Sequence, residues 1–538
     1  MCPVASPSPS HGEGWGGATL RLLLPLLLFL LPLPTPAAPP HLDELQHAVS
    51  LLEDEDVDAA RAVVEPLLPS ASTDPNVAFV GGILRFHQQR YADAVALFDA
   101  AGLNTPGDPD YRTLARLALE ITRNHARAES AHFVVSYPRG KDEVLVPYVL
   151  DALEAQRAAL QQDLGYAPPG KVTIEFLNDT RELAKLSTLT EQEIKTSGTI
   201  AICKFDKLMV VSPKALLQGY DWLDTAAHEY VHYVVTRRTR NNTPIWLQEG
   251  LAKYEETRWR GKGGEALTVE QAGMLRDAAR AGKLIPFARM HPSMAKLPSQ
   301  HAAALAFAEV MVAVEYLESR GGGALMNGVL DRIAAGATAE QAVSRSLGQP
   351  FDGFLDDWKR FIASRPLPAH GGKSVRPLRF KGDPEHGGDH SEWAEIPDER
   401  ARGFARLGEI LRARGRWEAA RIEYGKAVKL AGLDIPVLSS KYATAAMMTG
   451  HDAEAAAALS AALSAHPEGS TLHVQAARLF AKRKEWAKAR EELLLANRVD
   501  PFAPEIHAGL AQAATALGDP PAAAREEKFA RLLSQGER

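Results

Sequence analysis

The sequence predicts a mainly α-helical protein in which a small α+β domain lies between two sets of helical repeats. Turn-like segments recur near the carboxy terminus at intervals of 35, 34 and 34 residues, and two segments near the amino terminus are related by an offset of 34. Short β-rich runs gather between residues 131 and 213. The predicted order is a signal peptide (1–38), helical repeats (41–128), an α+β domain (131–364), a linker (365–398) and further repeats (399–535).

The amino-terminal segment has the pattern of a signal peptide. Residues 20–33 form an apolar run that is interrupted by two prolines and followed by Ala37 and Ala38. The run is too short to span a bilayer comfortably, so we expect cleavage near these alanines and no stable membrane insertion afterwards. Residues 1–18 contain no Lys or Arg, which indicates that the true start lies downstream. The expected location is the periplasm or the cell envelope, with secretion from the cell as the alternative.

The helical segment that follows repeats part of its own pattern. Residues 55–57 followed by Ala60 correspond to residues 89–91 followed by Ala94. This resembles tetratricopeptide repeats, in which a small alanine lets two helices approach closely and an aromatic such as Phe98 packs between them. Two such units are expected before the central domain.

The central domain begins with β-rich runs. These runs cover residues 132–137, 171–176 and 199–202, and a helical pattern at 142–164 separates the first two. We therefore expect a small sheet that leads directly into the helix described next.

A predicted helix at 222–238 carries the pattern H-E-x-x-H. His228 and His232 are four residues apart, so both imidazoles lie on one helix face and can bind one metal ion. Glu229 is offset by about a third of a turn, which places its carboxylate beside the metal as a base for water. A lone histidine pair at this spacing is more often part of helix packing, so further residues must support the metal hypothesis.

The next apolar segment offers the third ligand that a catalytic zinc requires. Glu249 lies within the sequence Trp-Leu-Gln-Glu-Gly at 246–250. An acidic group near a helix amino terminus can instead serve as a cap. The flanking tryptophan and glycine favour the ligand, and the sequence predicts one Zn²⁺ per chain bound by His228, His232 and Glu249.

These residues resemble the gluzincin metallopeptidases, in which H-E-x-x-H is followed by a helix with the pattern W-L-x-E-G-x-A-x-Y. Here that pattern occupies residues 246–254, and the nearest resemblance is to the peptidase MA-like domain. The resemblance implies a zincin fold, the three zinc ligands named above, and Glu229 as general base and acid. It also implies an edge strand that pairs with extended substrate, for which residues 198–202 and 208–211 are both candidates.

One position departs from the family pattern. In related domains of that family, the helix corresponding to residues 300–317 often carries a tyrosine whose hydroxyl group stabilises the oxyanion. This sequence has Phe307 there. Tyr254, His291 and Tyr316 are the alternatives, although packing is the more common role for the tyrosines and solvation for the histidine. The G-x-M-x-N segment of related aminopeptidases is absent before the metal helix, so exopeptidase activity has no support.

The carboxy-terminal repeats are predicted from four turns in register. Five places after the first residue of each turn comes an alanine, at Ala420, Ala455, Ala489 and Ala523. This too resembles tetratricopeptide repeats, whose solenoids present a groove for a protein partner. A proline-rich stretch between residues 365 and 398 is the predicted linker.

Together these features predict an exported zinc-dependent metallopeptidase, a hydrolase that is most consistent with an endopeptidase, with repeats that recruit substrate or a partner. The alternative is a repeat scaffold whose metallopeptidase-like domain is weak or inactive. A formal charge of -6 without a dense basic block gives no reason to expect nucleic acid as a partner.

Overall fold

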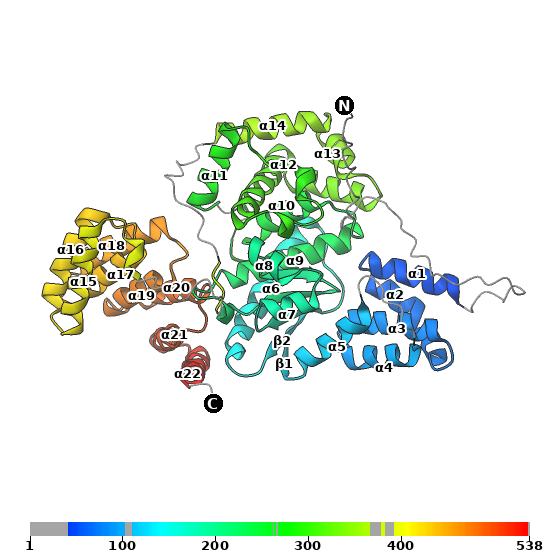
Figure 1. Cartoon of the computed structure of the whole chain (residues 1–538), viewed down its shortest axis with the longest axis horizontal. Helices are drawn as coiled ribbons and strands as arrows, with labels where there is room; N and C mark the ends of the chain where they lie inside the picture. The colour runs from blue at the N-terminus through cyan, green and yellow to red at the C-terminus, as the bar shows by residue number, and fades with distance from the viewer. Residues whose placement is uncertain are drawn as a thin grey trace, which may run out of the picture.

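The computed structural model describes residues 41–102, 110–261, 263–264, 267–365, 378–381 and 392–535. The predicted signal peptide and most of the predicted linker lie outside these residues. The described chain has a mixed sheet and its helices at the centre, with one group of helices on either side (Figure 1). Within that part of the chain, the search for a helix apolar and long enough to cross a membrane found none.

The central sheet has five strands in the order β1-β2-β3-β5-β4. Strands β2, β3 and β5 run parallel, while β1 and β4 pair antiparallel at the two edges. Their bounds are β1 His125–Glu129, β2 Phe133–Pro138, β3 Val172–Leu177, β4 Ala201–Lys204 and β5 Lys207–Val211. Of the three interior strands, β3 and β5 are buried along their whole length, as expected for strands covered on both faces.

The sheet contains one strand that the sequence did not predict, and it decides between the two candidate edge strands. The helical segment was expected to continue to residue 128, but His125–Glu129 is strand β1, because this short polar segment pairs in register with β2. Its partly exposed residues lack the apolar alternation that predicts a strand. Of the two candidate edge strands, residues 208–211 belong to interior strand β5, whereas β4 lies at the free edge.

The central helices cover the sheet and form the domain beyond it (Figure 1). They are α6 Val146–Leu164, α7 Thr180–Leu186, α8 Glu191–Ser197, α9 Trp222–Thr239, α10 Ile245–Glu255, α11 Val269–Arg280, α12 Gln300–Ala334, α13 Ala339–Leu347 and α14 Phe351–Ser364. Helix α9 begins where the Asp221 side chain accepts a hydrogen bond from the Asp224 backbone N–H. It ends at Arg240, which has a left-handed conformation. Ala226 and Ala227 are fully buried, so neighbouring elements can pack closely on this helix.

The amino-terminal helices join the sheet through a buried polar cluster. They are α1 Leu42–Glu53, α2 Val57–Val64, α3 Pro75–His87, α4 Tyr91–Ala101 and α5 Tyr111–Thr122. The Lys207 Nζ donates to the Tyr91 hydroxyl at 2.7 Å and to Glu175 Oε1 at 3.0 Å. All three side chains are buried, and their mutual hydrogen bonds satisfy the charges that burial would otherwise leave uncompensated.

The carboxy-terminal helices are consecutive and pack in pairs. They are α15 Glu399–Ala413, α16 Trp417–Ala431, α17 Pro436–Met448, α18 Asp452–Ala465, α19 Ser470–Lys482, α20 Trp486–Asn497, α21 Pro504–Ala516 and α22 Pro520–Ser534. The four alanines that the sequence places after each turn are buried in α16, α18, α20 and α22. That these pairs, and the amino-terminal helices, are tetratricopeptide repeats stays a prediction.

Part of the predicted linker is ordered against the central domain. Phe380 forms an antiparallel bridge with Leu216, and both side chains are buried. The Leu378 backbone N–H also donates to the Gln300 side chain at 3.0 Å. Residues 378–381 therefore pack on the domain between α14 and the carboxy-terminal helices.

Candidate metal centre

Helix α9 places two imidazoles side by side. His228 and His232 lie on successive turns, with ring centroids 4.8 Å apart. Their Nε2 atoms are separated by 3.2 Å. Helical spacing thus brings two ligand nitrogens to one point, as the sequence predicted.

Helix α10 adds a carboxylate to the pair. Glu249 Oε2 lies 3.3 Å from His228 Nε2 and 3.3 Å from His232 Nε2. A tetrahedral zinc ion with ligand bonds of 2.0–2.1 Å has ligand atoms about 3.3–3.4 Å apart. The three donors therefore form a triangle of the size that one face of a zinc coordination sphere requires. They are also the one group of metal-ligand type found in the described part of the chain.

Neighbouring side chains fix the orientation of both imidazoles. His228 Nδ1 lies 3.1 Å from Glu256 Oε2, and His232 Nδ1 lies 3.0 Å from Gln248 Oε1. Each acceptor favours a proton on Nδ1 and leaves the Nε2 lone pair free for a metal. The Gln248 amide is itself oriented, since its Nε2 donates to Thr236 Oγ1 at 3.2 Å.

The charge balance of the triangle also fits a cation. Burial lowers the pKa of His228, but hydrogen bonds with Glu249 and Glu256 outweigh it and raise that pKa to about 10. Burial raises the pKa of Glu249, but the two histidines outweigh that effect and hold it below its usual range. Three lone-pair donors that face one another need a positive charge between them. A proton meets that need in part, and a divalent metal ion meets it fully.

Glu229 lies beside this triangle in a buried position. Burial raises the pKa of its carboxyl group, while the two histidines and a hydrogen bond from the Cys203 backbone N–H act in the opposite direction. Cys203 belongs to edge strand β4, so the carboxylate is held between the metal helix and the free edge of the sheet. A base in such a place can reach water at the metal and a substrate along that edge.

The second helix of the site packs closely on α12 because of a glycine. A Cβ atom at Gly250 would lie 2.7 Å from the backbone oxygen of Val310. The close approach brings the Phe307 ring to 6.1 Å from the His228 ring. Phe307 therefore borders the site at the place where the family pattern has a tyrosine, and it offers no hydroxyl group.

The three alternative donors lie in other environments. The Tyr316 hydroxyl donates to Asp357 at 3.0 Å, and the Tyr254 ring packs against Gly264. His291 lines a cavity of about 1340 Å³ between the ends of α10, α11, α13 and α14. These contacts give the two tyrosines packing roles and leave His291 in a separate cavity.

The sequence predicted the three donors that the structure brings together, and it predicted Glu229 as the base beside them, but it did not predict the residues that orient the donors. Gln248 directly precedes a predicted ligand, and Glu256 lies two residues after the pattern at 246–254. Both are polar residues on a helix that carries a ligand, which was a usable signal. The Cys203 backbone N–H had no signal in the sequence, because its role depends on how the sheet packs on α9.

A His/His/Glu triangle with a second carboxylate beside it is the kind of site that metallopeptidases use. Residues 153–364 match the model of the Peptidase MA superfamily, so the chain contains a domain of that superfamily. The match lies within the predicted domain at 131–364 and begins after strand β2. No curated protein matches the sequence.

Solved structures similar to the chain include those of yeast leukotriene A4 hydrolase. The native yeast enzyme is 12% identical with a TM-score of 0.29, and the match covers 75% of this chain and 66% of that structure. The same enzyme in complex with bestatin gives 12% and 0.29, with coverage of 76% and 67%. The native enzyme from Saccharomyces cerevisiae gives 13% and 0.29, with the same coverage. The chain thus spans about two thirds of the length of these structures.

Proposed function

We propose that the chain is an exported zinc metallopeptidase that cleaves peptide bonds within protein or peptide substrates. The observation that carries this proposal is the triangle of His228, His232 and Glu249 with Glu229 buried beside it. Its edges of 3.2, 3.3 and 3.3 Å suit a tetrahedral zinc ion. Export rests on the amino-terminal sequence pattern alone.

The residues of the chain would divide the chemistry as follows. Bound zinc supplies Lewis acidity that activates water and polarises a carbonyl group. Glu229 accepts a proton from the attacking water on its carboxylate and passes it to the leaving amine. The Cys203 N–H orients that carboxylate, and burial keeps bulk water away from it. Glu256 and Gln248 hold the imidazoles in the tautomer that leaves Nε2 free.

Substrate would bind as an extended segment along strand β4. Among the described residues this strand pairs only with β5, so its other edge is left for a peptide, apart from the Cys203 N–H that donates to Glu229. The flanking helical arrays would recruit the protein substrate or a partner, as tetratricopeptide repeats do.

A second function has one specific observation in its favour. Phe307 lies beside His228 where a hydroxyl group is expected, so the domain lacks that oxyanion donor. The alternative is therefore a scaffold that binds metal but turns over substrate slowly or not at all.

The test is metal content and cleavage on protein lacking residues 1–38. We expect one zinc per chain by mass spectrometry, its loss in Glu249→Ala, and cleavage of casein or a peptide library. Glu229→Gln should keep the zinc but lower kcat by about 10²–10⁴-fold, since it removes only the base. Zinc binding without any cleavage would support the scaffold, and absence of zinc would refute both readings.

A further inference from the structure

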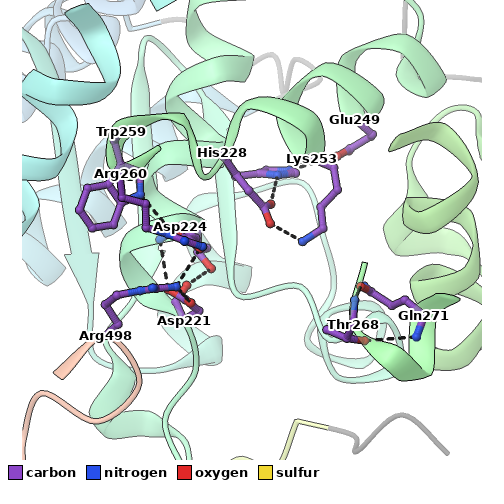
Figure 2. A network of polar contacts seen from close by, with 12 residues as sticks. Asp221, Asp224, His228, Glu249, Lys253, Trp259, Arg260, Thr268, Gln271 and Arg498 are labelled. Carbon is purple, nitrogen blue, oxygen red and sulfur yellow. Dashed lines mark hydrogen bonds and ion pairs between the residues drawn. The ribbon is translucent and has the colours of Figure 1, made fainter. Parts of the chain in front are cut away.

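The carboxy-terminal helices reach the metal helix through one loop. Arg498, between α20 and α21, forms ion pairs with Asp221 and, at 3.1 Å, with Asp224 (Figure 2). Asp221 caps α9, and Asp224 lies in its first turn. Arg498 and Asp224 are largely buried, so the pair between them is shielded from solvent, whereas the Asp221 side chain is 36% exposed.

The backbone of the same loop also holds the start of α9. The backbone N–H groups of Tyr220 and Trp222 donate to the oxygens of Val499 and Arg498 at 3.1 and 3.2 Å. The Trp222 indole donates to the oxygen of Asn497 at 3.0 Å. The loop therefore fixes both the direction and the position in which the chain enters the metal helix.

Asp224 connects this junction with the metal centre. It precedes His228 by four residues, so the two side chains lie on the same face on successive turns. Arg260 donates to its carboxylate at 2.8 Å and Trp259 at 2.9 Å. A carboxylate held by these donors and by Arg498 has little freedom to move, and the helix turn that carries His228 is fixed with it.

A second connection runs through α10. Lys253 pairs with Glu256, whose other carboxylate oxygen faces His228 Nδ1 (Figure 2). The charges of Glu256, Asp224 and Asp221 together favour the protonated form of Lys253 and raise its pKa, although burial opposes them. Lys253, the ion-pair partner of Glu256, therefore lies in the field of the same two aspartates that Arg498 holds.

We propose that Arg498 is a positioning residue for the metal centre, through which the carboxy-terminal array holds His228 in its metal-binding place. The array is then a structural part of the site as well as a candidate recruitment module. The inference rests on the proposed function only for its activity readout, because metal binding can be measured without substrate.

A merely structural docking contact is the competing explanation, and a second ion pair of the array, more exposed than those of Arg498, serves for comparison. Lys528 of α22 pairs with Glu143 at 2.5 Å, which also joins the array to the central domain. Its partner Glu143 lies in η2 (Lys141–Leu145), whereas the two partners of Arg498 lie at the start of α9. If weaker docking of the array were the only cause, substitutions of Arg498 and of Lys528 should both lower the zinc affinity.

The experiment measures zinc affinity by chelator competition, and the visible spectrum of the Co²⁺-substituted protein, on the chain lacking residues 1–38. Arg498→Met should weaken zinc binding about 10-fold, within the range for residues that orient metal ligands, and should alter the Co²⁺ spectrum. Arg498→Lys should recover part of the affinity because it keeps the charge. Lys528→Met should leave affinity and spectrum unchanged.

Two results would overturn the proposal. One is wild-type affinity and spectrum in Arg498→Met, and the other is an equal loss in Lys528→Met. If Arg498→Met does not fold, the zinc affinities of Arg498→Lys and Asp224→Asn are compared with that of the wild type instead. Wild-type affinity in both variants would then contradict the proposal. Zinc binding without peptidase activity would refute the proposed function and leave this inference standing, whereas a wild type that binds no zinc would remove both.

Discussion

The two ends of helix α9 are held by opposite ends of the chain in different ways. At its start, Arg498 of the carboxy-terminal array pairs with the buried Asp224 and with the partly exposed Asp221, and backbone hydrogen bonds from the same loop accompany these pairs. Near its end, Arg237 faces Asp56 and Asp58 of the amino-terminal helices at 3.9 Å each. Those two aspartates are 45% and 50% exposed, whereas Asp224 is 9% exposed.

This difference supports the proposal that the carboxy-terminal array is the one that positions the metal centre. Exposed pairs at 3.9 Å contribute little and are screened by salt. Buried pairs with backbone hydrogen bonds are directional and resist displacement. The stronger junction also lies nearer to His228, one turn away. We therefore expect changes at the start of α9 to reach the metal and changes at its end to affect mainly stability.

The largest effect should come from Gly219, which permits the close approach at the start of α9. A Cβ atom there would lie 1.9 Å from the backbone oxygen of Val499, and the residue has φ +67°. Gly219→Ala should cost about 3–5 kcal/mol, because it combines backbone strain with a clash, and should weaken zinc binding. Thermal unfolding and chelator competition measure the two effects.

The control for this substitution separates strain from clash. Gly282 has φ +64° and nothing within 4 Å of an added Cβ atom. Gly282→Ala should cost only about 1–2 kcal/mol from strain and leave zinc binding intact. Equal losses in the two variants would mean that the close contact with Val499 is unimportant.

An intermediate effect is expected at Asp206, near the other end of the helix. Burial raises the pKa of Asp206 to about 7, although Arg237 and the Tyr233 hydroxyl lower it. Because the folded pKa lies above the unfolded value near 4, the group stabilises the fold fully below pH 4 and loses this contribution as pH rises through 7. Asp206→Asn should therefore unfold like the wild type at pH 4 and be more stable at pH 8.5, by on the order of 2–4 kcal/mol.

Denaturant titrations at the two pH values test this prediction. A variant that is less stable than the wild type at pH 8.5 would show that the ion pair with Arg237, at 3.2 Å, outweighs the cost of burial. Zinc affinity should not change in either case.

The smallest effect is expected at Asp58. Its contact with Arg237 is long and half exposed, so Asp58→Asn should change stability by less than about 0.5 kcal/mol. Melting temperatures in low and high salt provide the measurement. A loss above 1 kcal/mol that disappears in high salt would mean that both ends of α9 are held equally.

The sequence was sufficient for features that depend on neighbouring residues. The spacing of His228 and His232 predicted their shared face, and the apolar segment around Glu249 predicted the second helix of the site. Strands β2, β3 and β4 followed from short β-rich runs. Local patterns have this power because periodicity directly determines which side chains share a face.

Features that depend on distant residues could not be predicted in the same way. Arg498 and Asp224 are 274 positions apart, and no periodicity relates them. Arg237, near the end of α9, pairs with Asp206 of the turn between β4 and β5, and no sequence pattern relates these two positions. The sequence did not predict strand β1, because this segment forms a strand through its pairing with β2 and not through its own composition.

The long separation between Asp224 and Arg498 sets an order of events during synthesis. A ribosome adds roughly 5–20 residues per second, so the 274 residues take about 14–55 s to make. Throughout that interval the first turn of the metal helix exists without its arginine. A truncated chain that ends before Arg498 carries His228, Glu229, His232 and Glu249 but lacks the arginine, so the junction is complete only near the end of translation.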